Sequence, residues 1–454
     1  MQAVNKNRCA NPFGEVGLPR GRSMLYIGPT MAEIRKVVQV MRRFAPDRWG
    51  GTESVVFQVS RALIGQGIES PIHCTAMLAP PGDDRLETVP IHRHRYVFPW
   101  FGLSRSDRNA LRLKGGSPLS LPLFFALLRE RNVSIVHVHV QHRLGGMART
   151  AARLKRVPLV VSLHGGLFTL PREQVERMVQ PFAGKPEWGK LFGALFGSRR
   201  VLDDADAIIC VGQSEYDEVR RRYPAKNVFL VPNGVDVQRF ARADGAAFRD
   251  AHGFLPSEKI VLCVSRIDYQ KNQLGLVRAF ARFAETHPDH RLVLLGPVTV
   301  EAYRDEVVAE TDRLGIAGKV RLIEGFRPDD PMLPAAYKAA EMFVLPSLHE
   351  PFGIVVLEAW AAGLPVLASR IGGIPGFVVD RETALLADPE REDEWVALMA
   401  ELAGGAALRA ALAARASATV AAHYDWAAIV SRMLGIYRQL ARERQGARSR
   451  KSPY

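Results

Sequence analysis

Residues 342–366 read MFVLPSLHEPFGIVVLEAWAAGLPV, and the fold of the chain follows from this stretch. The apolar run that opens it is typical of a buried strand, and a loop that carries Glu350 follows. A helix is predicted to begin near Gly353, where glycine lets the backbone approach a ligand closely and the free N–H groups of the first turn suit a phosphate. Gly363 and Pro365 are the signals that end this helix.

Two carboxylates flank the predicted helix N-terminus. Glu350 precedes it, and Glu358 lies about a turn and a half inside the helix. Such a pair suits the hydroxyls of a sugar and of a ribose, with backbone amides holding phosphates between them. The alternative is an ordinary helix with one N-terminal glutamate favoured by the helix dipole and one exposed mid-helix glutamate. The residues alone leave both interpretations open.

On both sides of this stretch, short β-branched runs alternate with longer amphipathic stretches, a pattern typical of a doubly wound α/β sheet. Two series of similar size predict two Rossmann-like lobes, with the boundary in the Pro- and Gly-containing segment 232–256. Ligands of such folds bind outside the carboxyl ends of the strands, so we expect the site in the cleft between the lobes. The predicted strands cover residues 37–41, 72–76, 135–140, 159–163, 207–211, 228–231, 260–264, 291–295, 320–323, 342–345 and 365–368.

The domain organisation follows from the two series. Met1, Met24 and Met31 are alternative starts of translation. The predicted units are an N-terminal extension outside the fold over residues 1–35, a first Rossmann-like domain over 36–232, a second one over 233–425, a C-terminal helix over 426–444 and a basic disordered tail over 445–454.

A second constellation, VSRIDYQKN, covers residues 264–272. Arg266 ends a predicted strand, and Lys271 lies about where the next helix begins. Arginine is a bidentate phosphate ligand and lysine a mobile point charge, so together they suit a diphosphate leaving group. The alternative is a solvated surface loop.

The first lobe offers two further candidates. Gly50 and Gly51 stand before a predicted helix, where paired glycines permit close ligand approach or simply form a turn. His164 lies at the carboxyl end of a predicted strand and therefore in the predicted cleft, although a single histidine is more often just a hydrogen-bonded or exposed side chain.

The segment from Glu350 to Ala359 resembles the signature of the family-4 glycosyltransferases, in which two glutamates bracket seven residues and an alanine follows the second. That family has the GT-B fold, two Rossmann-like doubly wound domains facing across a cleft. The resemblance spans about residues 36–440, and segment 264–272 is locally similar to the sucrose synthase and sucrose-phosphate synthase branch. The chain departs from the family at Gly376, where a glutamate is usual.

The resemblance implies that the first domain, residues 36–232, receives the acceptor and that the second, residues 233–425, binds the nucleotide sugar. Glu350 would contact the donor sugar, Glu358 the ribose hydroxyls, and Arg266 with Lys271 the departing diphosphate. His164 would lie close to the donor sugar and phosphate. The residues that the resemblance places around the donor are Gly50, Gly51, Gly296, Phe326, Phe352, Gly353, Ile354 and Glu358, and the implied catalytic set is His164, Glu350, Arg266 and Lys271.

The implied activity is hexosyl transfer with retention of configuration, from a nucleotide-diphosphate sugar to a hydroxyl acceptor such as a glycan, a lipid-linked saccharide or a small molecule. Neither a metal nor a cofactor beyond the donor is expected. No residue is marked for a carboxylate nucleophile, which agrees with the same-face attack proposed for the family. Two alternatives stay open: a sugar-nucleotide epimerase of the same fold and a non-catalytic protein that binds an anionic surface.

Charge is distributed unevenly between the two halves. The net charge of the chain is +14, yet residues 1–228 carry +15 and residues 229–454 carry −1. A basic first lobe predicts an anionic partner there, either a phosphorylated acceptor or an anionic membrane face docked by 191–196 and the arginines 199–200. No nucleic-acid motif accompanies the charge. No apolar run reaches the ~18 residues of a membrane span, and we expect a cytoplasmic protein. Whether it docks on the inner membrane face stays open, because 191–196 also fits an ordinary helix that packs on the core and has a solvated basic end.

Two metal-like patterns are set aside. Asp204 and Asp206 have DxD spacing but precede a strand instead of following one, which indicates a helix-to-strand junction. His137, His139 and His142 lack a further clustered ligand. The cysteines are far apart and lie mostly in apolar runs, so we expect buried thiols and no disulfide.

Overall fold

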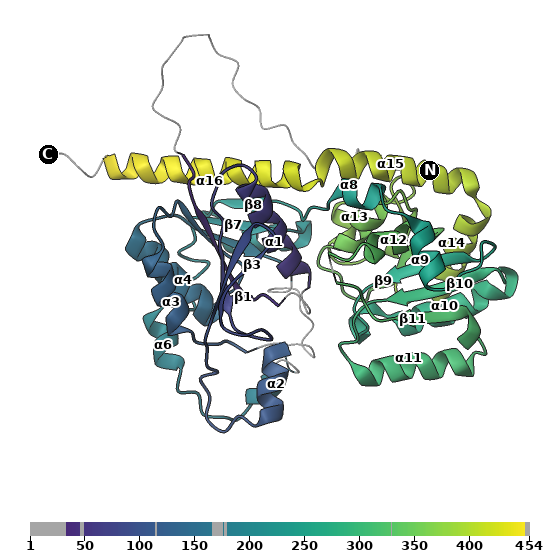
Figure 1. Cartoon of the computed structure of the whole chain (residues 1–454), viewed down its shortest axis with the longest axis horizontal. Coiled ribbons are helices and arrows are strands. Elements are labelled where there is room, and N and C mark those ends of the chain that lie inside the picture. The colour runs from purple at the N-terminus through teal and green to yellow at the C-terminus, as the bar shows by residue number, and fades with distance from the viewer. Residues whose placement is uncertain are drawn as a thin grey trace, which may run out of the picture.

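The computed structural model describes residues 33–45, 50–113, 116–165, 176, 179–327 and 329–449. Two α/β lobes stand side by side, and the C-terminal helix lies along the first of them (Figure 1). The first lobe holds an eight-stranded sheet, parallel except at its β3–β4 edge, and the second a six-stranded parallel sheet. The first sheet runs in the order β3 (Gly82–Leu86), β4 (Val89–His94), β2 (Ile72–Thr75), β1 (Val37–Arg43), β5 (Ile135–Val138), β6 (Leu159–Leu163), β7 (Ala207–Cys210) and β8 (Val228–Leu230).

The second sheet has the same doubly wound character. Its strands are β11 (Val320–Ile323), β10 (His290–Leu295), β9 (Lys259–Val264), β12 (Met342–Leu345), β13 (Val366–Ser369) and β14 (Leu385–Ala387), in that order. In both sheets the strand order reverses next to the first strand of the lobe, which creates a switch point at the carboxyl ends of the strands. The two switch points are where a ligand is expected.

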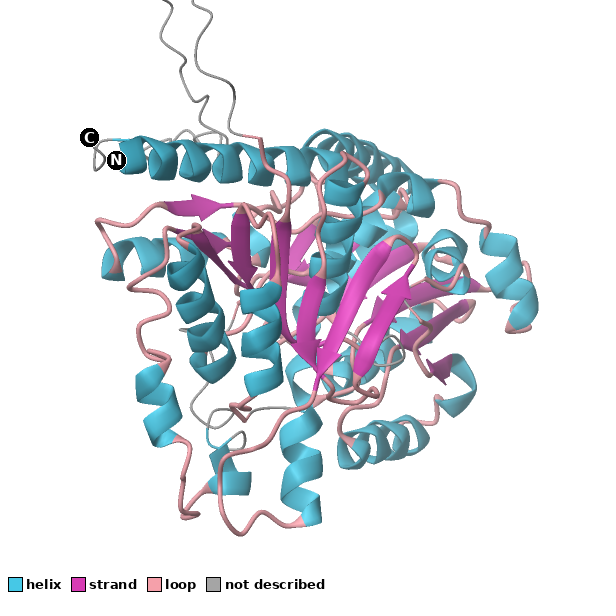
Figure 2. Ribbon diagram, turned by 60° about the vertical axis from the view of Figure 1, so that its left-hand side comes forward, coloured by secondary structure: helices cyan, strands magenta, loops and turns pink. Residues whose placement is uncertain are grey.

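Helices cover both faces of the sheets (Figure 2), which is why the strands read as continuous apolar runs. Alternate residues of β1 belong to different cores: Val38 packs in one cluster with α4, and Val37 packs in another with α1 and α16. The helices are α1 (Gly51–Ile64), α2 (Arg105–Leu113), α3 (Leu121–Arg129), α4 (His142–Lys155), α6 (Lys190–Leu195), α7 (Gln213–Arg222), α8 (Val237–Ala241), α9 (Gly245–Ala251), α10 (Gln273–Thr286), α11 (Glu301–Arg313), α12 (Met332–Ala339), α13 (Ile354–Ala361), α14 (Glu392–Gly404), α15 (Ala406–His423) and α16 (Trp426–Ser449).

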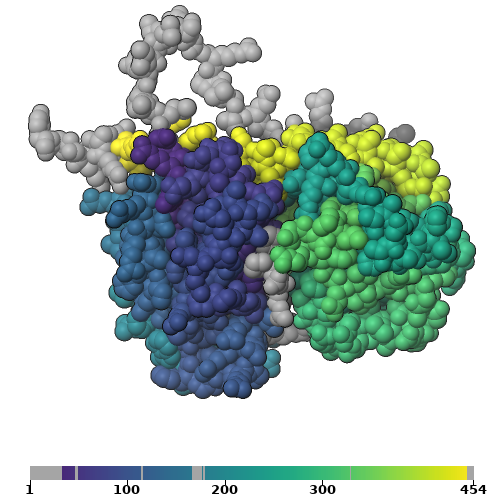
Figure 3. All heavy atoms as spheres, viewed as in Figure 1, coloured from purple at the N-terminus to yellow at the C-terminus, as the bar shows by residue number. Residues whose placement is uncertain are grey.

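The C-terminal helix α16 belongs to the first lobe although it follows the second in sequence. It packs beside α1, and Ile429 and Tyr437 lie in the core against β1, β5 and β7. The Tyr437 hydroxyl is 2.7 Å from Nδ1 of the buried His137 in β5. The chain therefore crosses back to the first lobe between α15 and α16, and this C-terminal segment runs over both lobes (Figure 3).

Two predicted boundaries need correction. The sequence placed a disordered tail from residue 445, yet α16 continues without a break to Ser449. It also placed residues 1–35 outside the fold, yet Ile34 is buried in the first-lobe core and the backbone N–H of Arg35 donates to Ser134 Oγ at 3.0 Å. Residues 1–32 and 450–454 lie outside the described residues.

No single described helix is long and apolar enough to cross a membrane. α14 and α15 pass that test only as a pair, bent by 96° at their junction. Both helices contribute buried residues to the second-lobe cores, among them Met399 and Leu412.

Candidate functional site

The two lobes touch through glycines that have no room for a side chain. A methyl group on Gly165, just after β6, would overlap the ring of Pro351 in the second lobe, and one on Gly212 would come within 2.8 Å of the Pro351 carbonyl oxygen. At Gly51 a methyl group would meet Ile354 Cδ1 at 3.6 Å. The cleft therefore brings the carboxyl ends of the first-lobe strands against the loop of Glu350.

The loop of Glu350 is fixed by its own backbone. Gly373 donates its N–H to the Glu350 carbonyl at 2.8 Å. Gly372 has φ +60° and lies so close that a methyl group there would overlap that carbonyl oxygen. Gly353 has φ +96° and is the N-cap residue of α13, and a methyl group on it would lie only 2.6 Å from Ile374 Cδ1. Glycine at these positions thus sets where Glu350 and the start of α13 lie.

Glu350 pairs with Lys271. The carboxylate is buried, with 7% of the residue exposed, and the Lys271 Nζ lies 2.5 Å from Glu350 Oε2. Lys271 ends a short 3₁₀ turn after β9, and Asn272 follows it with φ +53° to cap α10. The structure therefore brings together two residues that the sequence placed in separate motifs.

Arg266 leaves β9 beside this pair and is held differently. Its Nη1 lies 2.7 Å from the buried carboxylate of Asp268, and its Nη2 donates to Gln270 Oε1 at 3.2 Å. The guanidinium stays partly exposed. A charged donor for phosphate oxygens is therefore anchored at the strand end, and among the described residues no further side chain pairs with its remaining N–H groups.

Two helix N-termini face each other across the cleft. α13 begins at Ile354 and α1 begins at Gly51, and the two starts lie so close that a methyl group on Gly51 would be in ordinary contact with Ile354 Cδ1, at 3.6 Å. The N-terminal N–H groups of a helix and its dipole favour an anion. The arrangement is suited to a diphosphate between the lobes.

Glu358 lies one turn inside α13 and is partly buried. Tyr337 donates its hydroxyl to Glu358 Oε2 at 2.6 Å. Burial raises the pKa of the Glu358 carboxyl above its ordinary value, opposed by the Tyr337 hydrogen bond and the charge of Arg239. This side chain is thus a poised hydrogen-bond acceptor and not the exposed glutamate of the alternative interpretation.

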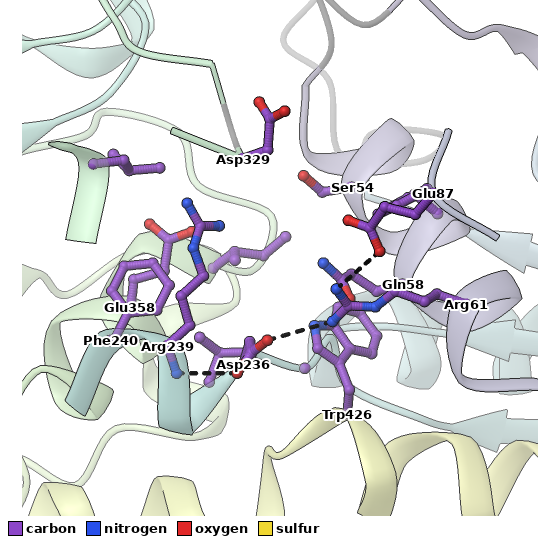
Figure 4. A pocket seen from close by; sticks show the side chains of 15 residues that line it. Ser54, Gln58, Arg61, Glu87, Asp236, Arg239, Phe240, Asp329, Glu358 and Trp426 are labelled. Carbon is purple, nitrogen blue, oxygen red and sulfur yellow. Dashed lines mark hydrogen bonds and ion pairs between the residues drawn. The ribbon is translucent and has the colours of Figure 1, made fainter. Parts of the chain in front are cut away.

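A pocket of about 220 Å³ adjoins Glu358 (Figure 4). It is lined from both lobes, by α1 on one side and by α8 and α13 on the other. Arg61 of α1 bridges to Asp236 before α8 at 3.3 Å, so an ion pair joins the lobes along its wall. The lining residues are Ser54, Phe57, Gln58, Arg61, Glu87, Gly234, Val235, Asp236, Arg239, Phe240, Asp329, Leu333, Ile354, Glu358 and Trp426.

His164 ends a hydrogen-bonded relay. Gln39 donates its amide to Ser70 Oγ at 3.2 Å, so its carbonyl oxygen accepts from His139 Nε2 at 2.8 Å. His139 Nδ1 is then free of hydrogen and accepts from His164 Nε2 at 2.9 Å. That order leaves His164 Nδ1 as an acceptor, and this atom is shielded from solvent without a partner among the described residues.

The relay is neutral. Burial lowers the pKa of His164 to about 4, and it lowers the pKa of His137 to about 3 and that of His139 well below the ordinary value. At neutral pH His164 therefore offers a lone pair instead of a charge. Gly165, next in the chain, donates its N–H to the buried Glu215 at 3.1 Å and so fixes the strand end.

Several predicted donor-binding residues offer only backbone to the cleft. Phe352 stacks on Phe377 at 4.8 Å in the core, and Phe326 packs edge-on against Phe248 at 6.4 Å. Gly296, with φ +155°, lies too close to the Ser265 carbonyl for any side chain. The position of Gly376 faces Gln213 of the first lobe, 3.2 Å from where its methyl group would be.

Sequence reasoning missed the partners of the predicted residues. Gln39, His139, Tyr337 and Arg239 were not singled out for these roles, and only the shared strand face of His137 and His139 signalled one of them. The residues that precede Gly50, Pro46 to Trp49, lie outside the described residues, and so does Gly166.

The DxD pattern is structural. Asp204 forms ion pairs with Arg149, Arg153 and Arg200. Asp206 accepts the backbone N–H of Leu159 at 2.8 Å. Both carboxylates serve the junction before β7, as the sequence indicated.

Two doubly wound lobes, each with a switch point, and a buried Lys–Glu pair beside the N-terminus of α13 define a protein of the two-Rossmann-domain class. Residues 245–419 match the family described as Glycosyl transferases group 1, and residues 49–239 match Glycosyltransferase Family 4. The chain is 31% identical over 409 residues to the D-inositol 3-phosphate glycosyltransferase of Actinosynnema mirum, covering 86% of this chain and 92% of that protein. It is 30% identical over 408 residues to the protein of that name in Mycobacterium avium, covering 87% and 90%.

Solved structures agree on the fold. Sucrose-phosphate synthase from Thermosynechococcus elongatus has a TM-score of 0.68 at 22% identity, covering 89% of this chain and 99% of that chain. Anabaena HepE in complex with UDP and glucose has a TM-score of 0.66 at 17% identity, covering 88% and 99%. The chain belongs to the group 1 and family 4 glycosyltransferases and has the GT-B fold.

A first prediction concerns the backbone that holds Glu350. Gly372 and Gly315 have φ of +60° and +66°, but a methyl group at Gly315 meets open space. Gly315→Ala should cost about 1–2 kcal/mol of unfolding free energy, from left-handed strain alone. Gly372→Ala should cost at least twice as much, because the methyl group also displaces the Glu350 carbonyl. Urea unfolding of both variants measures this, and equal losses would contradict the proposed constraint.

A second prediction concerns pH. The unfolded-state pKa of histidine is ~6.5, and that of folded His164 is lowered to about 4. Between these values the unfolded chain binds more protons, so stability falls as pH falls, by up to ~1.4 kcal/mol per pH unit for each such group. Urea unfolding from pH 7 to 4.5 should show this loss, with a shallower slope in His164→Gln. An unchanged slope would show that His164 is not held neutral.

Proposed function

We propose that this enzyme transfers a hexosyl group, with retention of configuration and without a metal ion, from a nucleoside-diphosphate sugar to a hydroxyl acceptor. The observation that carries the proposal is the Lys271–Glu350 pair, 2.5 Å apart, beside facing helix N-termini. A cation, helix dipoles and an anchored Arg266 stabilise the charge that grows on the leaving diphosphate, as a metal does elsewhere.

The donor sugar lies between Glu350 and His164 in this proposal. Glu350 accepts hydrogen bonds from sugar hydroxyls, and the neutral His164 accepts one more at Nδ1. Arrival of the diphosphate lets Lys271 exchange part of its contact with Glu350 for a phosphate oxygen. Glu358, already shielded beside Tyr337, takes the ribose hydroxyls.

The reaction then needs no carboxylate nucleophile. The acceptor hydroxyl attacks the anomeric carbon on the face that the diphosphate leaves, and its proton passes to the departing phosphate. Contact of the lobes at Gly165 and Pro351 keeps water from the donor. The names of the relatives favour transfer over the epimerase alternative.

A phosphorylated cyclitol is the acceptor that we would try first. The relatives are named for D-inositol 3-phosphate, and the chain covers 92% of the length of the first of them. The charge of +15 in residues 1–228 suits an anionic acceptor on the first lobe. A glycan or lipid-linked saccharide is tested in the same screen.

A third prediction tests the donor site. With EDTA present and no acceptor, the purified protein should slowly release the nucleoside diphosphate from one member of a panel of UDP-, GDP- and ADP-sugars. Glu350→Ala should lower that rate about 10²-fold or more, because it removes both the sugar contact and the partner of Lys271. Glu382→Ala, an exposed glutamate in the same lobe, is the matched control.

The outcomes separate the alternatives. Hydrolysis that needs a divalent metal would contradict the metal-independent mechanism, and an epimerised sugar nucleotide would identify an isomerase. If the protein neither turns over nor binds any donor of the panel, the proposed donor site is wrong. The donor found is then offered D-inositol 3-phosphate and neutral acceptors, which names the acceptor class.

We also propose that the enzyme works in the cytoplasm at an anionic membrane face through α6. Leu191 and Leu195 of this helix are 76% and 70% exposed, and Arg199 and Arg200 follow it closely. Apolar side chains beside arginines suit the interface of an anionic bilayer.

A fourth prediction follows for vesicles. The protein should sediment with vesicles that contain anionic lipid and not with neutral vesicles, and Leu191→Ser with Leu195→Ser should reduce the bound fraction several-fold. Leu255→Ser, a 61%-exposed leucine of the second lobe, is the control. Equal sedimentation with both vesicle types, or none, would refute membrane docking and leave the donor site untouched.

A further inference from the structure

A cluster of three histidines lies on one face of the first sheet, away from the cleft. His73 is the second residue of β2, and the parallel register pairs it with His92 of β4. His94 stands two residues further along β4, so its side chain shares the face of His92. Asp83 of the edge strand β3 pairs with His92 from the other side.

Glu130 completes the cluster from a helix. It directly follows α3, and its Oε1 lies 3.2 Å from His73 Nε2. One ligand atom from each of His73, His92 and Glu130 can be chosen so that all three lie within 4.8 Å of one another. His73 is buried, whereas His92 and Glu130 are partly exposed and so leave a path for an ion.

The outer contacts of the two rings leave one nitrogen of each on the side of Glu130: Nε2 of His92, and Nε2 of His73, which Glu130 contacts. Asp83 Oδ1 lies 2.7 Å from His92 Nδ1, which leaves Nε2 of that ring without this partner. His94 Nε2 lies 3.2 Å from His73 Nδ1, on the side opposite Glu130. A carboxylate or a neutral imidazole behind a histidine ligand is the usual way in which proteins fix its tautomer and orientation.

We propose that His73, His92 and Glu130 bind a first-row divalent metal ion of the Zn²⁺ type, with Asp83 and His94 orienting the two imidazoles. Two imidazole nitrogens, one carboxylate oxygen and a water give the four ligands that Zn²⁺ prefers. Zinc–ligand bonds of ~2.0–2.1 Å place ligand atoms ~3.4 Å apart. The partly exposed His92 and Glu130 side chains therefore move inward as the ion binds.

The positive charges of two nearby lysines, Lys36 and Lys155, oppose a cation here, but both ammonium groups have other hydrogen-bond or ion-pair partners. Lys36 Nζ lies 3.0 Å from Glu130 Oε2, but it also lies 2.8 Å from Glu69 Oε2, so it keeps a partner when Glu130 turns to the metal. Lys155 Nζ donates to the backbone carbonyls of Leu128 and Glu130 at 2.8 and 2.6 Å. Those bonds hold the end of α3 beside the cluster.

The proposed role is structural. Glu130 lies five residues before β5 and Lys36 directly before β1, at the amino edge of the sheet, while His164 lies at the carboxyl edge. The ion would join α3, β2 and β4 and so pin the β3–β4 edge hairpin. The turn of that hairpin carries Glu87, which lines the interlobe pocket and lies 3.5 Å from Arg61. This is separate from the catalytic cleft, where no metal is invoked.

A fifth prediction tests the site on the full-length protein. Protein stripped with EDTA and then freed of it should bind one equivalent of Zn²⁺, measured by competition with a chromogenic chelator, and Co²⁺ should give the visible absorption of a four- or five-coordinate site. His92→Ala should weaken Zn²⁺ binding more than 100-fold, and Asp83→Asn about 10–100-fold. Both side chains are at least partly exposed, so we expect both variants to fold.

Thermal unfolding gives a second readout. Zn²⁺ should raise the unfolding midpoint of the wild type and of the control His252→Ala, a second-lobe histidine, but not that of His92→Ala. Absence of Zn²⁺ binding, or one-equivalent binding that survives in both His92→Ala and Glu130→Gln, would overturn the proposal.

Discussion

The close approach of the backbone at Gly372 and Gly373 to Glu350 is the constraint on which the site depends. The hydrogen bond from Gly373 fixes the Glu350 carbonyl, and no side chain fits at either glycine. The same loop carries Pro351, which packs on Gly165 of the first lobe. One loop therefore places the carboxylate, starts α13 and sets how closely the lobes approach, so a change of backbone there alters all three.

Burial then decides which groups in the cleft carry charge. The relay from Gln39 through His139 leaves His164 neutral, with a lone pair at Nδ1. Glu358 is shielded beside Tyr337, and its pKa is raised. His164 and Glu358, two of the three groups proposed to accept hydroxyls, are thus shielded and His164 is uncharged, while the proposal leaves the fixed positive ends of α1 and α13 for phosphate. The chemistry of the site depends as much on what is neutralised as on what is charged.

The sequence predicted what local patterns encode. Buried parallel strands read as apolar runs, so most strands of both sheets were found, and the motif around Glu350 was found because its residues are contiguous. The edge strand β3 was missed because it is exposed and charged, and the end of α16 because its basic tail lacks an apolar stripe. Gln39 lies 100 residues from its partner His139. Such a pairing has no local signature, since it exists only once the sheet forms.

The Lys271–Glu350 pair explains how the side chains of the proposed donor site can be held in position before a donor binds. Either charge alone would be costly to bury, so each side chain neutralises the other and both are held near where they act. In the proposed mechanism the diphosphate brings negative charge to Lys271, and the sugar brings hydroxyls to Glu350. Each ligand group then replaces part of a contact that already existed. Because the side chains are ordered beforehand, little reorganisation remains for the moment of transfer, which is the condition under which fixed charges lower a barrier most.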